Sequence, residues 1–198
     1  MASEAPETPN FGQRYVILNL DWMALLLGAV ETTPEGQALI QRTTLKGMTP
    51  STKIISSFDH LHNTRFYPWP TGSGRWKAFC EAYYSVWRIK TGTPETKIDK
   101  RFIVDENDVI LAKTRWSATS GSAPKQILKA QNIDTVIISG LSLSGVLMST
   151  IYHLFELDYD IYVIEGNVLE LPPSDTTELK RLFSSKASLQ NEPACCIT

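Results

Sequence analysis

Cysteine is scarce in this chain of 198 residues, and the three that occur are Cys80, Cys195 and Cys196. An odd number, with two of them adjacent at the end of the sequence, cannot form a disulfide framework. Long apolar runs are also missing, because the best candidate, residues 15–30, is interrupted by Asp21 and is shorter than a membrane helix requires. It has no basic flank before it, so no secretory signal is expected. These absences predict a protein of a reducing compartment, with the cytoplasm as its expected location.

Charge of one sign is not in excess either. The formal net charge is −2, whereas a general nucleic-acid binder needs a basic surface, so that class of protein is excluded. Hydrophobic residues make up 42% and charged residues 20% of the chain, which is ordinary for a globular protein. We expect one domain over residues 13–190, between flexible tails at residues 1–12 and 191–198.

The sequence ends in a weak prenylation-like box. Cys195 begins the run CCIT, but its final Thr is a poor match to known boxes. No polybasic run precedes it to support attachment to a membrane. We therefore predict no membrane span, and lipidation of Cys195 is the less favoured alternative.

Short apolar runs without polar alternation occur several times, and segments of helical periodicity separate them. The predicted strands cover residues 15–20, 53–58, 108–112, 135–139 and 160–164. The predicted helices cover residues 34–46, 76–89, 123–131, 145–157 and 176–186. Strands that are apolar on both faces are typical of a parallel sheet covered by helices. The sequence therefore predicts an α/β fold with a doubly wound, mainly parallel six-stranded sheet and helices on both faces, in a Rossmann-like three-layer arrangement.

Two charged residues stand where apolar runs stop, and ligands of such sheets bind beyond the carboxyl ends of the strands. These residues are Asp21 and Lys113. A carboxylate and an amine that face one pocket can exchange a proton, and each shifts the pKa of the other toward its charged form. Considered alone, an Asp here is also typical of a helix cap or turn, and a Lys of a solvated surface.

Three motifs in order place these two residues in context. Residues 15–22 (YVILNLDW) are similar to a first strand that ends in a catalytic Asp, and residues 113–118 (KTRWSA) to the motif Lys-Pro-Arg-Tyr-Ser-Ala. Residues 133–146 (IDTVIISGLSLSGV) are similar to a strand followed by the turn Gly-Thr-Ser-Thr-Ser-Gly-Cys. Over residues 14–172 the chain thus resembles the isochorismatase-like hydrolases, which include isochorismatase, the nicotinamidases and N-carbamoylsarcosine amidase.

The resemblance implies catalytic roles for Asp21 and Lys113 and a small-molecule substrate. Because relatives commonly assemble, it also implies a homo-oligomer, and it implies neither a metal nor an organic cofactor. Amides at the start of a helix can stabilise an oxyanion, so the turn after the third motif's strand is the expected oxyanion or carboxylate pocket. Its residues are Leu141, Ser142, Ser144 and Gly145.

The main departure from the family is at Val146, which occupies the position of the nucleophilic cysteine. Valine has no nucleophile, so the resemblance predicts that no acyl-enzyme forms here. Loss of a nucleophile costs on the order of 10⁴- to 10⁶-fold in rate where the reaction depends on it. Cys80 is not expected to substitute, because an aromatic-rich predicted helix is typical of a buried, inert thiol.

Two hypotheses follow from this departure. In the first, Asp21 is a general acid assisted by Lys113, as in isochorismatases, which cleave a vinyl ether without a cysteine. The same proton transfers would support isomerisation, elimination or cyclisation. In the second, the chain is an inactive relative that binds a small molecule or a protein. The retained pair favours the first, because buried ion pairs are often no more stabilising than apolar residues. Residual amidase activity, sensitive to thiol alkylation, is a third possibility that we do not expect.

Further polar and aromatic residues fall near the strand ends and in the loop over residues 63–75. Those predicted to line a substrate pocket are Trp22, Phe58, His60, His62, Arg65, Trp116 and Thr119. The aromatic ones are equally typical of a core or a dimer interface. Asp59, His60 and His62 have the spacing of a metal site, but their shifted match to the nicotinamidase ligands favours a polar loop, and no metal is predicted.

Overall fold

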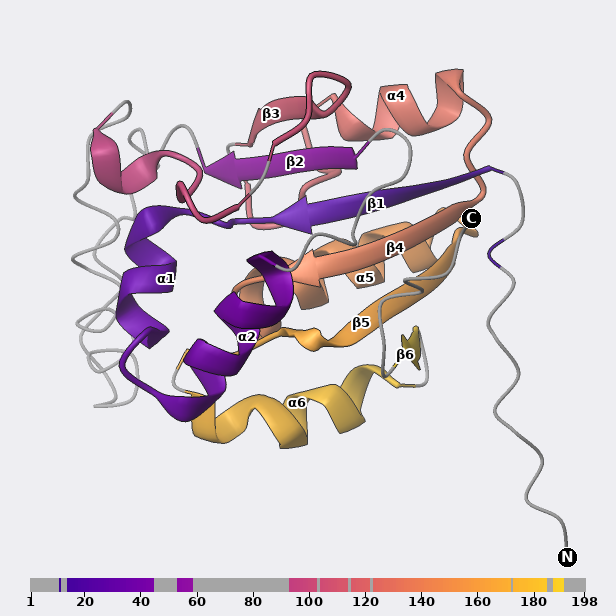
Figure 1. Cartoon of the computed structure of the whole chain (residues 1–198). Coiled ribbons are helices and arrows are strands. Elements are labelled where there is room, and N and C mark those ends of the chain that lie inside the picture. Colours follow the sequence, from indigo (N-terminus) through magenta and orange to yellow (C-terminus); the bar gives the residue numbers. More distant parts are fainter. Residues whose placement is uncertain are drawn as a thin grey trace, which may run out of the picture.

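The computed structural model describes residues 11, 14–44, 53–58, 93–102, 104–113, 115–121, 123–171, 173–184 and 187–190 (Figure 1). Within these residues, six strands form one parallel sheet in the order β3-β2-β1-β4-β5-β6. The strands are β1 (Tyr15–Leu20), β2 (Lys53–Phe58), β3 (Val109–Lys113), β4 (Thr135–Gly140), β5 (Asp160–Val168) and β6 (Ser188–Gln190). The predicted parallel α/β fold is confirmed.

Helices connect the strands and cover both faces of the sheet. They are α1 (Ala24–Val30), α2 (Pro34–Thr44), α4 (Pro124–Ala130), α5 (Met148–Phe155) and α6 (Thr176–Phe183). Two short 3-10 turns, η1 (Pro94–Thr96) and η3 (Pro173–Asp175), and one π-helical turn, η2 (Leu143–Leu147), complete the described elements. In Figure 1, α2 lies in front of β4 and α5 lies behind it.

Three elements differ from the sequence prediction. Helix α1 was not predicted, because its residues belong to an apolar run that continues from β1 without a clear helix-start signal. The helix expected from residue 145 begins earlier, as η2, and continues without a break into α5. Strand β6 is only three residues long, too short for a periodic signal. The helix predicted over residues 76–89 lies outside the described residues.

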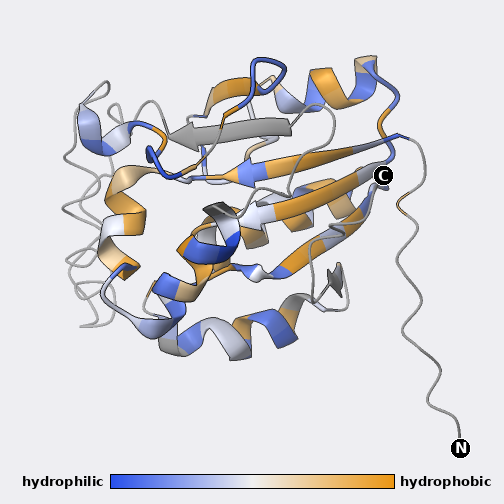
Figure 2. Cartoon of the chain, in the orientation of Figure 1, coloured by the Kyte–Doolittle hydropathy of each residue, from blue (hydrophilic) through white to orange (hydrophobic). Residues whose placement is uncertain are grey.

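The core explains why the central strands lack polar alternation. On one face, Val16, Leu18 and Leu20 of β1 pack in a cluster with residues of α5 such as Ile151. On the other face, Ile17 packs with residues of β4 and β5. Both faces of β1 are therefore buried, and Figure 2 shows the hydrophobic colour along most of β1, β4 and β5. Burial on both faces is the condition under which a strand is apolar throughout.

The carboxyl ends of the two central strands approach closely at Gly140. This residue pairs with Leu20 and has a φ of 137°, a conformation that other residues rarely adopt. A Cβ atom placed on it would lie 2.0 Å from the carbonyl oxygen of Leu20. Glycine is therefore required here, and the close approach brings the turn that begins at Leu141 beside Asp21.

We expect Gly140→Ala to lower the free energy of unfolding by at least about 2 kcal/mol, because the new methyl group meets backbone atoms and the φ is unfavourable. The matched control is Gly28→Ala in α1, where no atom lies within 4 Å of the added Cβ. That change should be neutral or stabilise by up to about 1 kcal/mol through helix propensity. Urea unfolding of both variants measures the difference, and equal midpoints would refute this account of Gly140.

Candidate active site

An ion pair joins the two charged residues at the strand ends. Asp21 follows β1 and has a φ of 56°, in the left-handed region that Asp tolerates better than most residues. Lys113 is the last residue of β3, which is separated from β1 by β2. Two strand spacings amount to about 9–10 Å, a gap that the long Lys side chain bridges. Its Nζ atom lies 2.8 Å from Oδ2 of Asp21, and both side chains are 0% exposed.

The loop after β3 supplies further acceptors to the Lys113 ammonium group. Its Nζ donates to the carbonyl oxygens of Arg115 at 3.4 Å and Trp116 at 3.5 Å. Together with the Asp21 carboxylate, these two carbonyl oxygens give three acceptors for the three N–H groups of the Lys113 ammonium. Burial lowers the pKa of Lys113 to about 8, and the Asp21 carboxylate opposes that shift. The structure therefore places in direct contact the two residues that the sequence predicts to face one pocket.

The residue assigned to the nucleophile position lies in η2 and is tied to the same loop. Val146 is 4% exposed. Its carbonyl oxygen accepts a hydrogen bond from Thr150 Oγ1 at 2.7 Å, and Thr150 Oγ1 accepts one from the Ala118 amide at 3.0 Å. Thr150 therefore holds the start of the helix and the loop that follows Lys113 in one fixed arrangement.

The ring of Trp116 rests directly against Gly145. A Cβ atom on Gly145 would lie 1.8 Å from Cζ3 of that ring. The Trp116 side chain is half-buried, so it covers the helix start from the side of the β3 loop. Glycine at position 145 is thus needed to admit the ring next to Val146.

The residues of the turn after β4 have different surroundings. Leu141 is buried in a hydrophobic cluster with Trp22, and Trp22 stacks on Phe102 with the ring centroids 5.7 Å apart. The peptide bond between Leu141 and Ser142 is cis. The Ser142 carbonyl accepts from the Leu147 amide at 3.1 Å. Trp22 is consequently a core side chain, and its predicted contact with substrate stays a prediction.

The amide of Ser144 donates to the carboxylate of Glu170, a residue that the sequence interpretation missed. Glu170 is 3% exposed and follows β5. No motif marks it, and only its place just beyond a strand end would have singled it out.

Thr119 belongs to a cluster of hydroxyl groups around His153 of α5. Its Oγ1 lies 3.0 Å from His153 Nδ1 and 3.0 Å from Ser117 Oγ. Ser120 Oγ is also 3.0 Å from His153 Nδ1. These contacts join the β3 loop to α5. Thr119 is 2% exposed, and its predicted contact with substrate stays a prediction.

Several predicted site residues belong to parts of the chain other than those described. The side chain of Phe58 and all of Asp59, His60, His62, Arg65, Cys80 and Cys195 lie outside the described residues. Within the described part of the chain, no group of three or more His, Cys, Asp or Glu side chains could hold a metal ion. None of the helices described there is long and apolar enough to cross a membrane.

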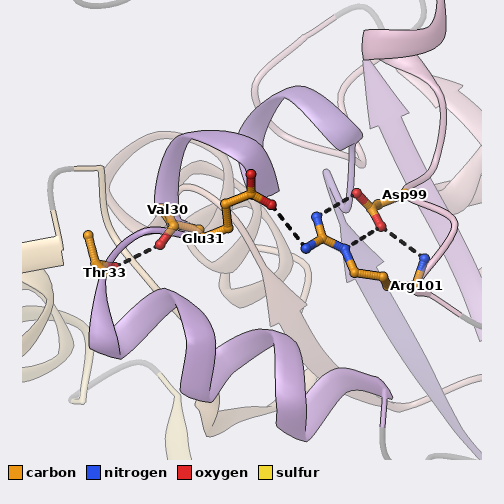
Figure 3. Close-up of polar contacts among 5 residues, drawn as sticks. All are labelled: Val30, Glu31, Thr33, Asp99 and Arg101. Carbon is orange, nitrogen blue, oxygen red and sulfur yellow. Dashed lines mark hydrogen bonds and ion pairs between the residues drawn. The ribbon is translucent and has the colours of Figure 1, made fainter.

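A second charged network fixes the backbone next to Asp21, and sequence reasoning missed it (Figure 3). Asp99 binds Arg101 through two contacts of 2.8 Å, and Arg101 also reaches Glu31 at 3.1 Å. The guanidinium group lowers the pKa of the Asp99 carboxyl. The amide of Asp99 donates to the Trp22 carbonyl at 2.8 Å. This network thereby holds the stretch from η1 to Phe102 against the corner between β1 and α1.

The sequence also matches a known protein family. Residues 16–188 match the model of the isochorismatase domain, which covers most of the chain. The chain belongs to the isochorismatase family. Members of this family act on small molecules. A search of curated proteins found no match.

Solved structures of the family have the same fold. N-carbamoylsarcosine amidase from Thermoplasma acidophilum is 17% identical with a TM-score of 0.68, and the match covers 92% of this chain and 99% of that one. Nicotinamidase/pyrazinamidase from Bacillus subtilis is 14% identical with a TM-score of 0.68, covering 90% and 100%. An isochorismatase-like hydrolase from Alkaliphilus metalliredigens is 15% identical with a TM-score of 0.68, covering 90% and 94%. At these identities the likeness establishes the fold alone.

Removing one member of the buried pair should destabilise the protein more than removing both. We expect Lys113→Met to cost about 3–5 kcal/mol, because it leaves the Asp21 carboxylate buried without its cation. The double variant Asp21→Asn/Lys113→Met should recover most of that loss, since Asn tolerates the left-handed backbone at position 21. Denaturant unfolding measures both changes.

Arg181→Met is the matched control, because it removes an exposed ion pair with Glu178 of the same 2.8 Å length. It should leave the unfolding midpoint unchanged. A double variant as unstable as the Lys113 single variant would contradict the proposed energetic coupling.

The ammonium group of Lys113 should titrate near pH 8 instead of its ordinary 10.5. Nitrogen-15 NMR of the Nζ atom measures this midpoint directly. Asp21→Asn should move it lower still, because the carboxylate raises the pKa of Lys113. Between pH 8 and 10.5 the Lys113 amine is protonated in the unfolded chain and mostly neutral in the folded one. Lys113 therefore makes the free energy of unfolding increase with pH over that window. A titration midpoint at or above pH 10.5 would show that burial is not the main influence on the pKa of Lys113.

Proposed function

We propose that this protein is an enzyme that acts on a small organic molecule by non-covalent general acid–base catalysis, with Asp21 as the proton donor. The supporting observation is the 2.8 Å contact between Lys113 Nζ and Asp21 Oδ2, with both side chains fully buried. A scaffold gains little stability from such a pair, because desolvation offsets the attraction. Functional sites are where such perturbed groups gather.

The pair can hold one proton in two places. Desolvation disfavours separate charges, so a proton can pass from the Lys113 ammonium to the Asp21 carboxylate and leave two neutral groups. Asp21 in its acid form can then protonate the terminal carbon of a vinyl ether. The resulting oxocarbenium ion adds water, which returns a proton to the Asp21 carboxylate, and the hemiketal collapses to a carbonyl compound and an alcohol. Isomerisation, elimination and cyclisation begin with the same proton transfer.

The turn from Leu141 to Val146 would position the substrate. Gly145 and Val146 lie in the first turn of a helix, where amides have no acceptor one turn back in the helix. Such amides can bind a carbonyl oxygen and stabilise charge that develops on it. Val146, at the position we assign to the family's cysteine, offers no nucleophile, so the proposed chemistry proceeds without an acyl-enzyme.

One observation favours a second candidate function, a binding module without turnover. Val146 is 4% exposed, and the Trp116 ring packs against Gly145 beside it. Apolar side chains thus close the turn where relatives would attack a substrate. In this alternative the protein would hold a small molecule or a protein partner and change neither.

Turnover of small molecules from a cell extract distinguishes the two functions. The purified protein should consume a compound and form a product, both identified by mass spectrometry, and Asp21→Asn should slow this by about 10²- to 10⁴-fold. Arg181→Met, on the exposed surface of α6, is the control and should match the wild type. Thiol alkylation should leave the rate unchanged.

Equal turnover by Asp21→Asn and the wild type would remove the acid role of Asp21. A compound that binds the wild type and is recovered unaltered would favour the binding module.

A further inference from the structure

The carboxylate of Glu170 contacts the chain in two places at the start of the helix. Its Oε2 accepts from the Ser144 amide, and its Oε1 accepts from the Leu171 amide at 2.8 Å. Its own amide donates to Thr176 Oγ1 at 3.0 Å. One residue earlier, the Leu169 carbonyl accepts from the Leu143 amide at 3.2 Å. The side chain is thus held from both sides, and only 3% of the residue is exposed.

This position is the one that an anion would occupy. Ser144 is in the first turn of η2, which continues into α5 as one helical segment of residues 143–155. Amides of a first turn lack acceptors within the helix, and the helix dipole makes this end positive. Anions bind at such ends for both reasons. Here a carboxylate of the chain itself already takes the Ser144 amide.

The charge of the Glu170 carboxylate bears on which ligands the turn can accept. Among the described residues, no Lys or Arg side chain forms an ion pair with it, whereas Lys113 is paired with Asp21. A substrate carboxylate that approached the Ser144 amide would therefore meet a second carboxylate in a poorly solvated place. Like charges repel strongly there, which is how a site can reject one class of ligand.

We propose that Glu170 determines substrate class: it fills the anion position of the Leu141–Val146 turn, so that the polar group bound there is a neutral carbonyl, amide or hydroxyl and not a carboxylate. This inference rests on the proposed function for the role of the turn. The amides of Gly145 and Val146, which follow Ser144, would bind the neutral oxygen.

Replacement of the carboxylate by a supplied anion tests this proposal without any turnover. Glu170→Ala of the full chain should melt about 4–8 °C below the wild type, because two charge-assisted hydrogen bonds are lost. Sodium formate should then raise the melting temperature of Glu170→Ala by about 3 °C relative to sodium chloride at equal ionic strength. The formate concentration should be well above the dissociation constant of formate from the variant. Formate should have no such effect on the wild type, whose position is filled.

Formamide is the matched neutral probe, since it has the same size as formate and no charge. It should stabilise Glu170→Ala by less than a third of the formate shift. An equal effect of formate on the wild type and the variant, or of formate and formamide on the variant, would overturn the proposal.

Glu170→Ser is the second variant, chosen in case the alanine variant does not fold in chloride. It should show the same selective response to formate. If neither variant folds even with formate present, the proposal fails, because a supplied anion should replace the missing carboxylate. None of these outcomes depends on catalysis by Asp21 and Lys113, so they separate this inference from the proposed function.

Discussion

The contact between Lys113 and Asp21 is the constraint on which the rest of the site depends. Two fully buried opposite charges are tolerable only at short range and with every remaining N–H group of the amine supplied with an acceptor. The loop after β3 meets the second requirement by turning its carbonyl oxygens toward the amine. Any change in the relative position of β1 and β3 would separate the pair and expose each charge to the full cost of burial.

The surrounding scaffold holds the short distance between Lys113 Nζ and Asp21 Oδ2. The close approach of β1 and β4 at Gly140 fixes where Asp21 leaves the sheet. Thr150 joins the loop after Lys113 to the start of the helix that carries Val146. These contacts come from segments far apart in the sequence. The site is therefore held by contacts among elements that are distant from one another in the sequence.

The sequence predicted the fold well because buried parallel strands have a strong local signal. Residues 15–20 and 135–140 are mostly apolar and are buried on both faces, and that pattern is typical of strands at the centre of a sheet. Asp21 and Lys113 were identified because they stand at the ends of such runs and within ordered motifs. That they form one contact could be expected from the shared edge of the sheet, although the crossing of β2 by the Lys side chain could not.

Other parts of the site have no local signal. Glu170 is a carboxylate in an irregular stretch, and its role depends on a partner 26 positions earlier in the chain. Helix α1 was hidden in an apolar run, since periodicity cannot separate a short buried helix from a continuing strand. Contacts of this kind arise from the tertiary fold, and one sequence carries no pattern that reports them.

The network of Glu31, Asp99 and Arg101 has a consequence for engineering. It attaches the returning chain to the carbonyl of Trp22, one residue from the Asp21 carboxylate, while the outgoing chain leaves from the end of β2. A redesign of the chain between β2 and η1 should therefore leave Glu31, Asp99 and Arg101 unchanged, because they keep the attachment beside Asp21 in place.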